Sequence, residues 1–114
     1  MKVIYNNIIP FPGYIAINLF TLIFVRKDLA HKFNAVSENH EAIHTAQMKE
    51  TLFVGFYLLY LLFWIFRLLQ SWSFDKAYYN ISFEQEALEF EKDFTYLERR
   101  QPYAWIGYQL KRIK

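Results

Sequence analysis

The sequence predicts an α+β fold in a single domain that spans residues 1–114. Three observations support this class: an extended N-terminal segment, a histidine pair at helical spacing, and two later helical segments, one apolar and one acidic. We therefore expect a small N-terminal antiparallel sheet, then a helix carrying the histidine pair, a long apolar helix and a C-terminal acidic helix. A chain of this length has room for one hydrophobic core.

Extended structure is expected within residues 1–33. The segment Lys2–Ile9 is rich in β-branched and aromatic residues and ends at Pro10-Phe11-Pro12-Gly13, where proline and glycine exclude a helix. The segment Tyr14–Val25 has the same composition and forms one long strand or two short ones. Two alternatives fit less well. A signal peptide would not contain the interrupting asparagines and prolines, and a membrane span over Tyr14–Val25 would be short.

The segment Asn39–Gln47 has the residue types of a catalytic metal site. On a helix, His40 and His44 lie one turn apart on the same face, so both imidazoles can bind one ion, as in H-E-x-x-H peptidases. Glu41 then lies beside that ion, where it can accept a proton from a metal-bound water. The chain has no cysteine, so any metal must be held by nitrogen and oxygen. The simpler interpretation is an exposed helix face with two incidental histidines.

A catalytic zinc site needs a third protein ligand, and Glu50 is the first candidate. It occupies the last ligand position of the pattern H-E-x-x-H-x-x-G-x-x-H, but Gln47 replaces the glycine that this bend requires. We expect the helix to be capped by Ser37 and to continue to Glu50, which places Glu50 about 9 Å beyond His44 along the axis. Glu50 is therefore rejected as a ligand and expected to be solvated or to contact a ligand.

The second candidate comes from a family resemblance. In the gluzincins the third zinc ligand is a glutamate in an E-x-x-small pattern, often followed by aspartate. Glu84-Gln85-Glu86-Ala87 resembles this pattern, which implies Glu84 as ligand, on a helix whose start fits a capping box of Ser82 and Gln85. Glu86 is the alternative ligand, because residues two apart on a helix face different sides and only one can serve. Leu88 replaces the aspartate, so the carboxylate that orients a histidine is either missing or supplied by Glu89 or Glu91. The other acidic residues are expected to form a solvated face.

The order of these parts also resembles the minigluzincins. More closely, it is similar to small bacterial H-E-x-x-H proteins of unknown function that share N-H-E-x-I-H-x-x-Q and F-E-x-E-A, over roughly residues 10–105. The resemblance implies Zn²⁺, a zincin metallopeptidase site, and a peptide or protein substrate bound along an edge strand between Tyr14 and Val25. Tyr78, Tyr79 and His31 are the candidates for stabilising an oxyanion.

Residues 51–69 form a long apolar helix. No charged residue occurs from Thr51 to Phe66, and 19 residues are just enough to span a bilayer. If His44 and Glu84 share one ion, however, residues 70–83 would have to cross back, and as a helix they cover only about 21 Å. We therefore expect this helix to lie at a membrane interface or to pack in a homo-oligomer, with a full span as the main alternative.

The sequence therefore predicts a membrane-associated or cytoplasmic zinc metallopeptidase, in which His40, His44 and Glu84 bind Zn²⁺ and Glu41 is the general base. The alternative is a non-catalytic small protein, either membrane-associated or metal-stabilised, that acts through its contacts. The 13 basic and 11 acidic residues give a net charge of +2, which indicates no nucleic-acid partner.

Overall fold

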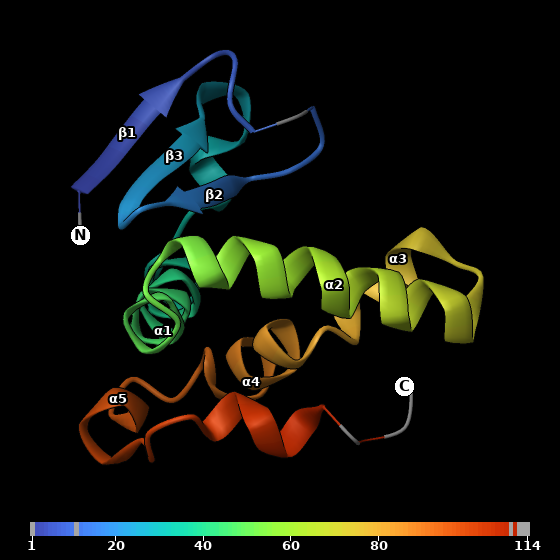
Figure 1. Cartoon of the computed structure of the whole chain (residues 1–114). Helices are drawn as coiled ribbons and strands as arrows, with labels where there is room; N and C mark the ends of the chain where they lie inside the picture. Colours follow the sequence, from blue (N-terminus) through green and yellow to red (C-terminus); the bar gives the residue numbers. More distant parts are fainter. Residues whose placement is uncertain (1, 11, 110, 112–114) are drawn as a thin grey trace.

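A computed structural model describes residues 2–10, 12–109 and 111, and it confirms the α+β class. Figure 1 shows the sheet as one layer, the helices α1 and α2 beside it, and α4 beneath them with the C-terminal segments on its far side. The candidate site lies where these layers meet, because α1 and α4 pack against each other and β2 packs on α1.

The sheet contains β1 (Lys2–Asn6), β2 (Ala16–Leu19) and β3 (Leu22–Arg26), in the order β1-β3-β2. β2 and β3 form an antiparallel hairpin, but β1 pairs parallel with β3, so the prediction of an all-antiparallel sheet is wrong and the sheet is mixed. The hairpin turns at Phe20 and Thr21, both with positive φ (50° and 72°). Such turns favour Asn-Gly, so the sequence carries no ordinary signal for this one.

Helix α1 (Ala35–Glu50) carries the histidine pair and runs to Glu50 as predicted. Its N-cap is Asn34, whose side chain accepts a hydrogen bond from the Ser37 backbone N–H at 3.1 Å, so the predicted cap at Ser37 is wrong. Ser37 completes the capping box from the third helical position instead. After α1, Leu52 and Phe53 both adopt positive φ (59° and 62°), and the chain leaves in a new direction.

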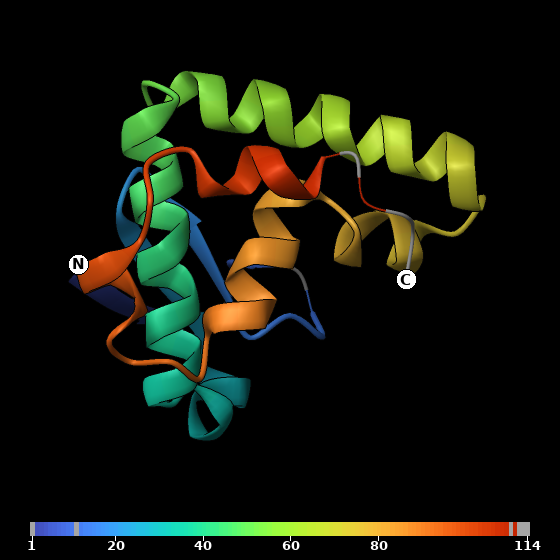
Figure 2. The same cartoon turned by 90° about the horizontal axis from the view of Figure 1, so that it is seen from below.

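Helix α2 (Val54–Ser71) is the predicted apolar helix, shifted by about one turn from residues 51–69. Figure 2 shows that it runs along one side of the molecule, across the end of α1. Its inner face packs Phe56 and Phe63 against Phe83 and Trp105. Arg67, only 2% exposed, also points inward and donates to the Asn80, Tyr108 and Gln109 carbonyl oxygens at 2.9–3.1 Å.

The remaining segments complete the helical layer. Helix α4 (Ser82–Phe90) is the predicted acidic helix, but its N-cap is Ile81, and Gln85 donates to the Asn80 carbonyl, so the Ser82–Gln85 capping box is absent. The short helix α3 was not predicted; it is capped by Ser73, whose side chain accepts from the Lys76 N–H. The bounds of the other segments are η1 (Lys27–Lys32), α3 (Phe74–Tyr79), α5 (Tyr96–Arg99) and η2 (Ala104–Tyr108).

Candidate metal centre

The structure brings together the three predicted metal ligands. Nε2 of His40 and Nε2 of His44 lie 3.1 Å apart, and Oε1 of Glu84 lies 3.0 Å and 3.2 Å from them. In a tetrahedral zinc site with bonds of about 2.0–2.1 Å, ligand atoms lie about 3.3 Å apart. The three atoms therefore have the spacing of one face of such a tetrahedron, and they form a group that can hold a metal ion.

Both histidines have a second partner that fixes the ring orientation. Nδ1 of His40 lies 2.9 Å from Oε1 of Glu91, and Nδ1 of His44 lies 2.8 Å from Oε1 of Gln47. The amide orientation of Gln47 is set because its Nε2 donates to the Phe83 carbonyl and to Glu86. Each Nδ1 therefore donates a hydrogen, so in the neutral rings both Nε2 lone pairs are directed at the shared point.

The protonation states of His40, His44 and Glu84 depend on one another. Although burial disfavours their charged forms, the carboxylate of Glu84 raises the pKa of His44 to about 9 and raises that of His40. The same interaction, against the effect of burial, holds the pKa of Glu84 well below its usual value. Oε2 of Glu84 accepts a hydrogen bond from the Tyr60 hydroxyl at 2.6 Å. Without a metal, the site therefore retains protons on its imidazoles, and a divalent cation would replace them.

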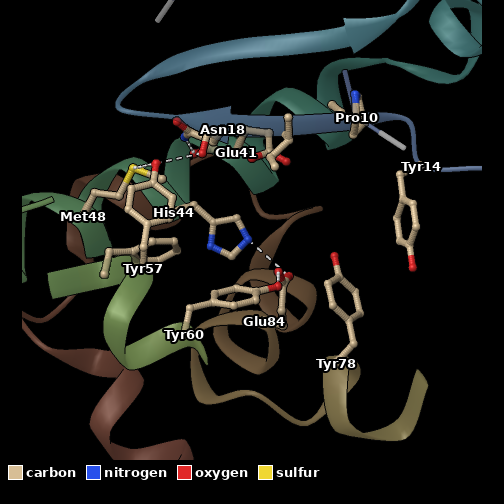
Figure 3. A pocket seen from close by; sticks show the side chains of 13 residues that line it. Pro10, Tyr14, Asn18, Glu41, His44, Met48, Tyr57, Tyr60, Tyr78 and Glu84 are labelled. Carbon is tan, nitrogen blue, oxygen red and sulfur yellow. Dashed lines mark hydrogen bonds and ion pairs between the residues drawn. The ribbon is translucent and has the colours of Figure 1, made fainter. Parts of the chain in front are cut away.

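Glu41 lies next to this group and faces a pocket of about 330 Å³. Figure 3 shows Glu41, His44 and Glu84 on the wall of the pocket, with Tyr57 and Tyr60 of α2 beside His44 and Glu84, and Tyr14 and Tyr78 on the other side. The Glu41 side chain is buried, and burial raises its pKa above the ordinary value. A carboxylate with a raised pKa beside a metal is well matched to accepting a proton near neutral pH.

A second hollow, of about 360 Å³, adjoins the first. The two share Tyr14, Ala16, Glu41 and Tyr78, and the second reaches His40. The metal group and Glu41 therefore lie where an apolar pocket meets a more polar one. The edge strand β2 runs beside both, in the place predicted for a substrate.

The three oxyanion candidates differ in position. The Tyr78 ring comes from α3, and Figure 3 shows its hydroxyl pointing toward Glu84 and the pocket. Burial and the nearby carboxylates raise the pKa of Tyr78, so it stays a hydrogen-bond donor at neutral pH. Tyr79 is 55% exposed and packs edge-on against Tyr78, and His31 is exposed on η1. Of the three, Tyr79 lines the second hollow and only Tyr78 lines both.

Two glutamates that were expected to be solvated are instead paired inside the molecule. Glu86 is fully buried, accepts hydrogen bonds from Arg100 and from the Tyr96 hydroxyl, and does not face the metal group. Glu50 accepts two hydrogen bonds from the same guanidinium, at 2.9 Å and 3.1 Å. Both predictions of solvation are wrong, because Arg100, which is distant in sequence, folds back between the two carboxylates.

Two residues that support the site had no predicted role. Gln47 belongs to the N-H-E-x-I-H-x-x-Q pattern and lies three residues after His44, so helical spacing alone places it beside that ring. Tyr60 comes from the apolar helix, and nothing in its local sequence connects it to Glu84.

Comparisons of the chain with protein-family models, with curated proteins and with solved structures give no match. Its function therefore has to follow from its own side chains.

Proposed function

We propose that this chain is a minimal zinc metallopeptidase of gluzincin type, with His40, His44 and Glu84 as metal ligands and Glu41 as general base. The observation that carries the proposal is the arrangement of Nε2, Nε2 and Oε1 within 3.2 Å of one another, with Glu41 beside them on the wall of an open pocket. Three protein ligands with an open side are typical of a catalytic zinc site rather than a structural one.

The donor set fits zinc, since two neutral imidazoles and one carboxylate are ligands that zinc prefers. A zinc ion held there would supply Lewis acidity and would lower the pKa of water at the site toward neutrality. The carboxylate of Glu41 accepts the proton of the attacking water and then delivers it to the leaving amine nitrogen. The Tyr78 hydroxyl donates a hydrogen bond to the negative charge that develops on the carbonyl oxygen.

The substrate class follows from the two hollows. An extended peptide beside β2 would place an apolar side chain in the pocket formed by Ile17, Met48 and Phe56. At the C-terminal end of β2 the backbone groups already have a partner. The Tyr57 hydroxyl donates to the Asn18 carbonyl and accepts from the Phe20 N–H. We propose cleavage of peptides next to an apolar residue, with pairing limited to the start of β2.

The substitution Glu41→Gln tests this proposal. It removes the base but keeps the size of the side chain, so peptide hydrolysis should fall by roughly 10²- to 10⁴-fold while bound zinc stays near one ion per chain. Hydrolysis is measured on a mixed peptide library by mass spectrometry, and zinc by elemental analysis of untagged protein. The matched control is Glu38→Gln, on an exposed position of the same helix, which should leave both unchanged.

A second candidate is a metal-stabilised interaction protein without catalysis, which the extensive exposed apolar surface of α2 favours. It predicts zinc near one ion per chain, no hydrolysis by the unchanged protein, and a Glu41→Gln variant that behaves normally in binding and stability. Hydrolysis that survives in Glu41→Gln would also contradict the peptidase proposal. Protein that purifies without metal would contradict both candidates.

A further inference from the structure

We infer that α2 docks this protein flat on the interface of a lipid bilayer, with its outer face in the acyl-chain boundary. This inference concerns the surface of the molecule and is independent of the proposed peptidase activity. It rests on the composition of the outer face, on the polar contacts of the inner face, and on the aromatic residues at the end of the helix.

The outer face of α2 is apolar over its whole width. Its large exposed side chains include Val54, Leu58, Leu61, Leu62, Ile65 and Leu69, with exposed fractions of 40–61%. Together with Phe66 they cover roughly 140° of the helix circumference at 3.6 residues per turn. From Thr51 to Phe74 the only charged residue is Arg67, and it is buried. Among the described residues, no helix or strand lies on the outer side of α2 in Figure 2.

The inner face prevents α2 from crossing the membrane, although its length and hydropathy would allow a span. Tyr60 donates to Glu84, and Arg67 donates to carbonyl oxygens of the neighbouring segments. A crossing helix would carry these polar groups and the packed helices into hydrocarbon, where their charges are costly. The helix can therefore contact lipid on one side only, lying parallel to the surface.

A lipid surface fits the outer face better than a second copy of the chain. Paired helices bury a narrow seam and place charged residues on its flanks, where they stay in water. Here the flanks are leucine and phenylalanine, so a paired helix would still expose apolar side chains. Leu52, Trp72 and Phe74, which are 70–84% exposed, extend the patch beyond both helix ends. Tryptophan at such an end is typical of a membrane interface.

Vesicle flotation of the full chain tests the inference. With phosphatidylcholine vesicles, most of the protein should float, and 1 M salt should not release it, because the contact is apolar and the net charge is only +2. The double variant Leu58→Glu/Leu62→Glu should reduce the bound fraction at least tenfold. The matched control Phe94→Glu/Leu97→Glu changes two exposed apolar residues outside α2 and should float like the unchanged protein.

Circular dichroism and zinc content of the variants show that they are folded, and Glu41→Gln should float normally, which separates this inference from the peptidase proposal. Protein that stays unbound in the absence of salt overturns the inference. So does a soluble dimer that Leu58→Glu/Leu62→Glu dissociates, because a second copy would then cover the face.

Topology is tested with single cysteines, since the chain has none. Lys49→Cys and Lys76→Cys place exposed thiols on the elements that flank α2. In sealed vesicles with bound protein, a membrane-impermeant maleimide should label both positions from outside. Labelling of only one would show that α2 spans the bilayer and would overturn the flat arrangement.

Discussion

Glu84 and Glu86 are two residues apart on α4 and almost fully buried, yet their negative charges are compensated in different ways. Glu86 is paired with the guanidinium of Arg100, which is charged at any physiological pH. Glu84 is paired with His40 and His44, whose charge depends on bound protons. A permanent partner makes the first pair structural. The second pair has an exchangeable positive charge, and a metal ion can take the place of the protons.

The largest difference between Glu84 and Glu86 should appear in the affinity of the protein for zinc. Glu84→Ala removes a proposed ligand, so zinc affinity should fall on the order of a thousandfold or more, above the roughly 10- to 100-fold typical of losing an outer partner. Competition with a chromogenic chelator measures this change. Glu86→Ala should lose at most about a hundredfold, through the loss of its contact with Gln47. An equal loss in both variants would mean that Glu86 is itself a ligand.

The free energy of unfolding should depend more strongly on Glu86 than on Glu84. Glu86→Ala leaves the buried Arg100 with one carboxylate and leaves the Tyr96 hydroxyl unpaired, so the free energy of unfolding should fall by about 3 kcal/mol. Urea unfolding in the presence of a chelator measures it. Glu98→Ala, at an exposed position of α5, is the control and should change stability by less than about 0.5 kcal/mol. A Glu86→Ala variant as stable as that control would refute the structural role.

The smallest effect is a pH dependence of the free energy of unfolding. It should come from the pairing of Glu84 with His44 and not from the pairing of Glu86 with Arg100. The folded-state pKa of His44, about 9, is raised above the unfolded value of 6.5, so its stabilising effect is full below pH 6.5 and is lost as pH rises through 9. Metal-free protein should therefore lose roughly 2–3 kcal/mol over this range. Urea unfolding at pH 6.5 and 9.5 checks this, with Glu84→Ala as the control that should show a flatter profile.

Excess zinc should reverse the sign of that pH dependence, because the ion binds deprotonated imidazoles and its affinity rises with pH. A metal-free protein whose stability is constant across this range would contradict the coupling between His44 and Glu84. Arg100 keeps its charge throughout, so the Glu86 pair should contribute equally at both pH values.

The sequence predicted the parts of the site that depend on local spacing. His40, Glu41 and His44 are fixed by one helical turn, and the E-x-x-A pattern identified Glu84 and anticipated an acidic partner for a histidine, which is Glu91. The class of the fold followed from the same local patterns. Pairings between distant segments were missed, because no local pattern encodes them.

Two errors show this limit clearly. The parallel pairing of β1 with β3 depends on which edge of the hairpin β1 reaches after a connection that carries no register signal. The pairing of Glu50 and the burial of Glu86 depend on Arg100, 50 and 14 residues away along the chain. A glutamate on a helix looks solvated until its cation is found, and that cation can come from any later segment.

The inward-pointing Arg67 has a consequence for synthesis of the chain. Its guanidinium needs the carbonyl oxygens of Tyr108 and Gln109, so α2 cannot dock stably before those residues have been made. At about 5–20 residues per second, the 42 residues from Arg67 to Gln109 take roughly two to eight seconds. During that interval the inner face of the nascent apolar helix lacks these last partners and its outer face is uncovered, which makes lipid available as a contact before the protein core is complete.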